Sequence, residues 1–166
     1  WIVIFFSTMS GLGRTFIAEE ERGTVLTLQL IARPLTIFFG KLLFNIVLLS
    51  VLNIVTVTLY LILISNFAIR SVDIFIVTMV FGTLGLATTS TILAAIIAKA
   101  NTKGTLYPVI SFPILVPLLL TVINATQMAV DGSPFIEAID VLKILISYLV
   151  VIGVASYMMF EYIWKD

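Results

Sequence analysis

Few residues in this chain could do chemistry. The 166 residues contain no cysteine and no histidine, so within them there is no disulfide, no thiolate or imidazole metal ligand and no histidine general base. Two short patterns resemble nucleotide-binding motifs but lack essential residues. The stretch 11–16, Gly-Leu-Gly-Arg-Thr-Phe, has Phe16 where a dinucleotide fingerprint needs its third glycine. Gly40-Lys41 has Leu35 in place of the leading glycine of a phosphate-binding loop and Leu42 in place of its Ser/Thr. We therefore expect no catalytic residue, no metal site and no cofactor bound by this chain.

One charged cluster lies between two long apolar runs and organises the chain. It is followed by a short, partly apolar segment that ends at Pro34, because proline disfavours helix at the preceding Arg33. Residues 19–34 are too few to cross a bilayer and too apolar for a free loop, so we expect a short helix along the membrane interface. We interpret this coupling segment as a docking site for a partner, with these candidate residues: Glu19, Glu20, Glu21, Arg22, Gly23, Leu26, Leu28 and Leu30. A solvated acidic turn beside a lipid-facing helix is the alternative.

Composition places the chain in a membrane. Hydrophobic residues make up 61% and charged residues 11%, with a mean hydropathy of +1.22, against about 45–50% and about 25% in soluble domains. Nine basic and nine acidic residues balance, so there is no basic footprint for nucleic acid. We expect an all-α polytopic bundle in one domain, with five spans at about 1–17, 35–64, 74–98, 105–123 and 141–163. Because Trp1 already lies inside an apolar run, we expect the sequence to be a fragment.

Polar and small residues inside the expected spans indicate helix packing. Asn45 and Asn53 are eight residues apart and lie on a similar helix face, where amides bond neighbouring helices. Gly82 and Gly85 place small residues on one face, which allows two backbones to approach closely. Substrate contact is the alternative for the asparagines. Lys41, near the start of its span, is expected to reach lipid headgroups.

The fourth span carries an unusual density of proline. Pro108, Pro113 and Pro117 each remove a backbone donor, so we expect this helix to be kinked or locally broken. Both a moving, pathway-lining helix and plain structural kinking are consistent with this pattern. Residues 124–140 are expected to form the longest polar loop, with a short surface helix after Pro134. Tyr162 and Trp164 are expected to form an interfacial aromatic belt at the end of the last span.

The basic residues predict an orientation. If the coupling segment, the turn at Lys99 and the C-terminus share one side, that side carries seven basic residues against Arg70 and Lys143 on the other. The seven are Arg14, Arg22, Arg33, Lys41, Lys99, Lys103 and Lys165. By the positive-inside rule, that side is the cytoplasm.

The pattern resembles the CcmB family, haem exporter protein B, the permease of the ABC transporter system for bacterial cytochrome c maturation. The resemblance is carried by Phe16-x-x-Glu19-x-x-x-Gly23, by the leucines at 26, 28 and 30, and by Pro34 followed seven residues on by Lys41. Further along, Lys103-Gly104 leads into Pro113-x-x-x-Pro117. These motifs extend over nearly the whole chain.

The resemblance implies a six-span permease of the bacterial inner membrane, with one span before Trp1. It also implies a separate CcmA-like ATPase, so that ATP acts only through a partner, and association with CcmC- and CcmD-like proteins and the haem chaperone CcmE. Haem is then the candidate substrate, and the absence of histidine fits a subunit that does not itself ligate haem. Membrane lipid surrounds such a subunit, and a homodimer is left open.

Two other classes remain open at this point. A permease for polysaccharide, lipid or drug would share the same architecture. A membrane enzyme would need clustered acidic or histidine residues in or beside the spans. Here the acidic residues gather only in the coupling segment and in residues 124–140, which disfavours an enzyme.

Overall fold

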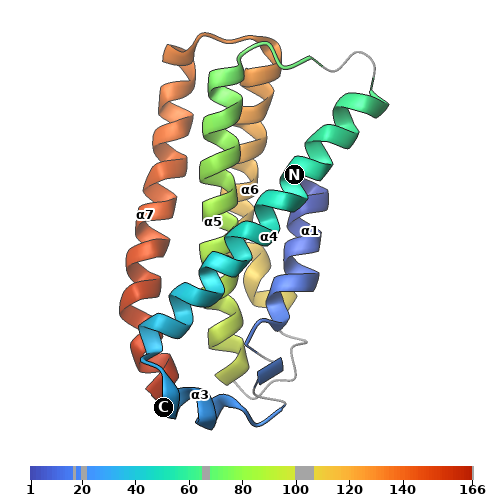
Figure 1. Cartoon of the computed structure of the whole chain (residues 1–166). Helices are drawn as coiled ribbons and strands as arrows, with labels where there is room; N and C mark the ends of the chain where they lie inside the picture. The colour runs from blue at the N-terminus through green and yellow to red at the C-terminus, as the bar shows by residue number, and fades with distance from the viewer. Residues whose placement is uncertain (17, 20–21, 65–67, 100–106, 166) are drawn as a thin grey trace.

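The chain folds as a set of helices (Figure 1). The structure is a computed structural model that describes residues 1–16, 18–19, 22–64, 68–99 and 107–165, with the backbone alone for Arg14, Val25, Leu26, Gln29, Pro108 and Lys165. Its elements are α1 (Ile2–Gly11), the 3-10 helix η1 (Leu12–Arg14), α3 (Val25–Ile31), α4 (Pro34–Leu63), α5 (Val72–Lys99), α6 (Tyr107–Asp131) and α7 (Phe135–Lys165).

Among the described residues, four helices, α4 to α7, are long and apolar enough to cross a membrane. Over the expected fifth span at 1–17 the structure has α1, which has ten residues where a span needs about 20, so the number of spans stays a prediction. α1 ends where Gly11 and Gly13 weaken the α-helix, and the chain continues as η1. The structure is therefore that of a helical membrane protein in which α1 packs against longer helices.

α5 is the central helix. In its most apolar stretch 78% of the residues are buried, against 11% in α4 and 17% in α7. It is also the least apolar of the four spanning helices, and small or hydroxylated residues cover it from Gly82 to Ala95. Lipid-facing helices need apolar surface, whereas a helix enclosed by others needs small residues for close packing. α5 therefore contacts α4, α6 and α7 at once.

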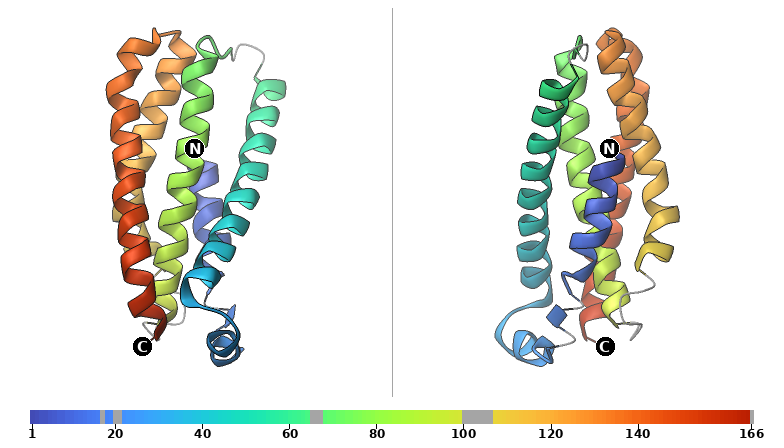
Figure 2. Two further views of the ribbon diagram at one scale, coloured as in Figure 1. Left: turned by 60° about the vertical axis from the view of Figure 1, so that its left-hand side comes forward. Right: turned by 90° about the vertical axis from the view of Figure 1, so that its right-hand side faces the viewer.

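α4 crosses the others obliquely. It begins with Pro34 as its first helical residue after an extended Arg33, as proline geometry favours. Its 30 residues make a helix about 45 Å long, more than the hydrocarbon core of about 30 Å. It lies against α5 over much of its length and separates from α5 toward Leu63 (Figures 1 and 2).

The two ends of the bundle are different. The end with α3, the start of α4 and the last residues of α5 and α7 is called the Glu19 end; the opposite end, with the turn from α6 to α7, is called the Gly132 end (Figure 2). At the Gly132 end the amides of Arg70 and Ser71 donate to the Ala129 carbonyl at 3.2 and 2.9 Å. These bonds satisfy a carbonyl in the last turn of α6, which has no partner within its own helix.

The expected loop over 124–140 is wrong. α6 continues to Asp131 and α7 begins at Phe135, so only three residues, 132–134, connect them. Ala125, Ala129 and Ala138 are fully buried in a cluster with residues of α5. Small side chains there let three helices meet closely, and this packing outweighs the polar character of Asn124 to Asp131. The short helix expected after Pro134 is the first turn of α7.

Candidate functional site

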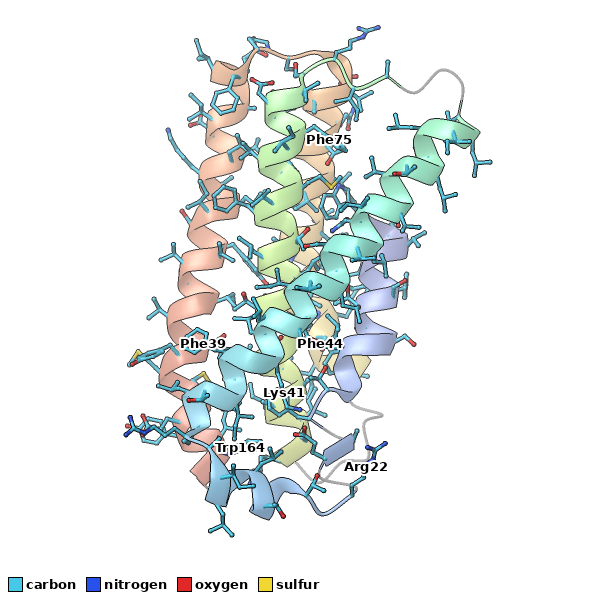
Figure 3. The ribbon with its side chains drawn as sticks, in the orientation of Figure 1. Arg22, Phe39, Lys41, Phe44, Phe75 and Trp164 are labelled. Carbon is cyan, nitrogen blue, oxygen red and sulfur yellow. The ribbon has the colours of Figure 1, made fainter. Side chains whose placement is uncertain are left out.

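The Glu19 end gathers most charged residues that the sequence singled out. Arg22, Arg33 and Lys41 lie there, with Lys99 at the end of α5. Figure 3 shows Lys41, Arg22 and Trp164 at this end of the bundle. Glu20, Glu21 and Lys103 lie outside the described residues. Arg70 and Lys143 lie toward the Gly132 end. The described basic residues therefore fall into the two groups that the orientation prediction assumed.

Lys41 turns inward and does not reach outward to headgroups as expected. Its side chain is 16% exposed and its Nζ lies 2.7 Å from Glu19 Oε1. The same Nζ donates to the Thr15 carbonyl and lies 4.4 Å from the centroid of the Phe16 ring. Thr15 follows the 3-10 helix η1, and a cation is favoured at such a C-terminal end. The ammonium group of Lys41 thus connects α4 to three residues that precede α3, namely Thr15, Phe16 and Glu19.

Phe16 belongs to an aromatic cluster shared by three parts of the chain. Its ring lies 5.6 Å from Phe160 and 5.7 Å from Trp164, between ring centroids. Phe38 of α4 lies 4.8 Å from Phe160. Trp164 is only 4% exposed, so its expected place in an interfacial belt is wrong, whereas Tyr162 is exposed. The tryptophan is buried because α7 continues to this depth beside α4 and the residues after η1.

A left-handed glycine shapes the chain before α3. Gly23 has φ +66°, and the amide of Thr24 donates to the Glu19 carbonyl at 3.1 Å. Helices commonly end with such a bond, which runs from the residue after a left-handed glycine to the carbonyl five residues earlier. It reverses the chain beside Glu19, so α3 starts next to the ion pair.

α3 presents its leucines in different directions. Leu28 packs against the main core, while Leu30 and Ile31 are 88% and 77% exposed. The expected set Leu26, Leu28 and Leu30 therefore does not share one surface; the side chain of Leu26 is not described. Successive helical residues turn by about 100°, so Leu28 anchors α3 and Leu30 points away from the bundle. Arg22 and Gly23 are exposed beside it.

A groove of about 460 Å³ lies between α1 and α4 beside the ion pair, lined by Gly11, Thr15, Glu19, Lys41 and Phe44 among others. Glu19 Oε2 is buried and has no hydrogen-bond partner among the described residues. The carboxylate is therefore only partly satisfied by Lys41, and an acceptor remains in the low-dielectric part of the site.

The two asparagines form a seam between α4 and α5. Asn45 Nδ2 donates to Thr91 Oγ1 at 2.8 Å, and Asn53 Nδ2 donates to Thr83 Oγ1 at 2.7 Å. The pairs run in opposite directions along the two helices, as antiparallel packing requires. Both asparagines are buried. Beyond this seam Val57 of α4 still packs against the cluster that contains Ile74 and Phe75, and α4 separates from α5 toward its end at Leu63 (Figure 1).

The glycines of α5 lie where other elements approach. A Cβ on Gly82 would be 2.8 Å from the Trp1 ring and 2.9 Å from Val122 Cγ1. A Cβ on Gly85 would be 3.0 Å from Leu118 Cδ1. Both glycines therefore allow α6, and at Gly82 also the start of α1, to pack directly on α5.

Of the kink or local break expected in the proline-rich span, the break is wrong and the kink stays a prediction. α6 is one α-helix from Tyr107 to Asp131 with Pro113 and Pro117 inside it. The Tyr148 hydroxyl of α7 donates to the Ile114 carbonyl at 2.9 Å, next to the carbonyl of Pro113 that Pro117 deprives of its donor. A neighbouring helix thus supports the backbone at the prolines. Pro108 lies in the first turn, and a role for the prolines in movement stays a prediction.

In the described part of the chain these residues make contacts between elements. Among the described residues no group of three or more His, Cys, Asp or Glu side chains is placed to hold a metal ion. What sequence reasoning missed was the partner of Lys41. The available signal was a single lysine at the seventh position of the expected span 35–64, which lipid headgroups and an inward carboxylate explain equally well until α1 and α4 are placed side by side.

Comparison with known proteins supplies a family. A family model described as CcmB protein matches residues 1–160. No curated protein and no solved structure matches the chain.

Proposed function

Because the chain belongs to the CcmB family, the haem exporter protein B family, we propose that it couples ATP hydrolysis by a separate ATPase to haem delivery for cytochrome c maturation. Family membership makes it a transporter membrane subunit and not itself an enzyme. It also favours haem over the polysaccharide, lipid or drug that a related permease would carry. Haem transport and release of a loaded CcmE-like chaperone are the two forms that this delivery can take.

The observation that carries the proposal is the exposed apolar tip of α3. Leu30 and Ile31 are among the most exposed large apolar side chains of the described chain, and they lie at the end where the basic residues gather. A permease without a nucleotide motif must obtain free energy through a contact with its ATPase. We propose that α3, together with Glu20 and Glu21 before it, forms this contact, with Leu30 and Ile31 entering an apolar groove of a CcmA-like partner.

The orientation belongs to the same proposal. The docking end faces the cytoplasm, where ATP is available, and the C-terminus lies on the same side in a bacterial inner membrane. CcmC- and CcmD-like proteins then join the complex through the spans, and a second copy of this chain would give the ATPase two docking segments. Haem is the substrate of the complex, and the described residues offer it no histidine or cysteine ligand.

Two matched substitutions test the docking site. Leu30→Asp and Ile136→Asp place the same charge on side chains that are 88% and 80% exposed at opposite ends of the bundle. We expect Leu30→Asp to reduce co-purification of the co-expressed ATPase by about tenfold, as loss of one central contact of about 1.4 kcal/mol would do. Ile136→Asp should retain the ATPase at the wild-type level. Replacing Glu20 and Glu21 by lysine should also weaken the contact, by removing charge complementarity.

Retention of the ATPase by Leu30→Asp and by the lysine double variant would show that docking happens elsewhere. If α3 served only as a membrane-interface helix, Leu30→Asp would leave ATPase binding unchanged. Leu28→Asp is unsuitable for this test, because Leu28 packs against the core and its replacement would disturb folding. Single cysteines at 30 and 136, labelled with an impermeant reagent in intact cells, test the orientation: only position 136 should react.

A further inference from the structure

α3 and the segment before it are attached to α4 in two places. The first is the chain itself, since Ala32 and Arg33 are extended and lead directly into Pro34. The second is the ion pair of Glu19 with Lys41, two helical turns further along α4. A helix joined to another by one extended connection can swing about it. A helix joined at two separate points must carry its neighbour when it moves.

The second attachment is well defined chemically. The ammonium group of Lys41 has three donors, and it meets Glu19 Oε1, the Thr15 carbonyl and the face of Phe16. Side-chain exposures of 16% and 26% mean that water screens this pair less than a surface pair. Phe16 also packs on Phe160 and Trp164, which fixes the position of the ammonium between α4 and α7.

We propose that the ion pair of Glu19 and Lys41 is the joint through which a displacement of the docked α3 is transmitted to α4. Lys41 and Glu19 are positioning residues in this scheme, and the inference rests on the proposed docking function. α4 is suited to respond, because it separates from α5 toward its end at Leu63 (Figure 1). Among the described residues Glu19 Oε2 has no hydrogen-bond partner, so the geometry of the pair can change without breaking a hydrogen bond at this oxygen.

The test separates the joint from the docking contact. The double variant Glu19→Gln/Lys41→Met removes both charges and leaves no buried charge without a partner, which keeps folding close to normal. We expect it to co-purify the ATPase at the wild-type level. The yield of holo-cytochrome c in cells should fall by about 2- to 30-fold, the range by which residues on a coupling route alter coupling. Reversing the pair with Glu19→Lys/Lys41→Glu should recover part of this yield.

Asp140→Asn/Lys143→Met is the matched control, because it removes the exposed ion pair of α7 and should leave the yield unchanged. A direct readout uses spin labels at positions 62 and 136, two exposed sites on α4 and α7, in a sequence without other cysteines. Trapping the complex with ATP and vanadate should change the distance between the two spin labels in the protein with Glu19 and Lys41. The same trapping should not change this distance in the Gln/Met variant.

If the Gln/Met variant keeps the ATPase but gives a wild-type yield of holo-cytochrome c, or the same change in spin-label separation as the protein without these substitutions, the joint is overturned and the docking site stands. Loss of the ATPase from that variant would show that the pair belongs to the docking surface and would also overturn the joint. Retention of the ATPase by Leu30→Asp would instead overturn the docking site and, with it, the inference that rests on it.

Discussion

The two ends of the bundle have similar local features, a left-handed glycine and an ion pair, but these features differ in what they connect. Each has a left-handed glycine, Gly23 with φ +66° and Gly132 with φ +81°, and each has the same hydrogen bond back to a carbonyl five residues earlier. Each also has an ion pair. At the Gly132 end the pair of Lys143 with Asp140 lies within one helix and is exposed. At the Glu19 end the pair joins two segments and is mostly buried.

The difference lies in what surrounds these devices. A Cβ on Gly132 would be 3.1 Å from the side chain of Arg70, whereas no atom of the described residues lies within 4 Å of one on Gly23. The turn at the Gly132 end packs on the chain itself. The turn at the Glu19 end is open and leads into α3 with its exposed Leu30 and Ile31. A closed end holds the bundle together, and an open end offers contacts to another molecule.

The largest expected effect comes from breaking one ion pair at each end. Lys41→Met leaves the Glu19 carboxylate partly buried without its charge partner, so we expect the free energy of unfolding to fall by about 1.5–3 kcal/mol. Lys143→Met breaks an exposed pair and should cost about 0–1 kcal/mol. Unfolding in mixed detergent micelles with increasing dodecyl sulfate measures both values. Equal losses in the free energy of unfolding would show that the two ion pairs contribute equally to stability, and would contradict the proposed difference between the two ends.

A smaller effect is expected from alanine at the two left-handed glycines. Both Gly132→Ala and Gly23→Ala meet the cost of placing an L-residue in this region, about 1–2 kcal/mol. Gly132→Ala should be the more destabilising, because its Cβ would also press on Arg70. Gly40→Ala is the control: Gly40 lies in α4 with open space around it, so the change should stabilise by about 0.5–1 kcal/mol. Melting temperatures of the three purified variants rank them, and a higher melting temperature for Gly132→Ala than for Gly23→Ala would contradict the closed character of that end.

The smallest effect concerns the seam that connects the two ends. A double-mutant cycle with Asn45→Leu and Thr91→Val should give a coupling energy of about 0.6 kcal/mol, with about 1.7 as the upper limit for such bonds in membranes. The matching cycle with Asn53→Leu and Thr83→Val should give a similar value. A much stronger pair at Asn53 would mean that α4 is held firmly near the point where it separates, against the mobility that the joint requires.

Much of the architecture follows from the sequence. The long apolar runs predict membrane helices, Pro34 predicts the start of α4, and the segment 19–34 is correctly set apart as containing a short helix, α3. These features are local: they depend on the apolar length that a bilayer requires and on the backbone restrictions of proline. The asparagines at 45 and 53 are placed on an inward face because their spacing alone puts them together on a helix.

Contacts between distant segments were decided by the tertiary structure. Residues 124–131 read as a polar loop, yet they are helical because Ala125 and Ala129 pack against α5. Trp164 reads as an interfacial residue, yet it is buried against Phe16 and Phe160. Lys41 reads as a headgroup contact, yet it pairs with Glu19. In each case the residue type permits two environments of similar local energy, and the neighbour that selects one of them comes from a part of the chain that sequence spacing does not bring near.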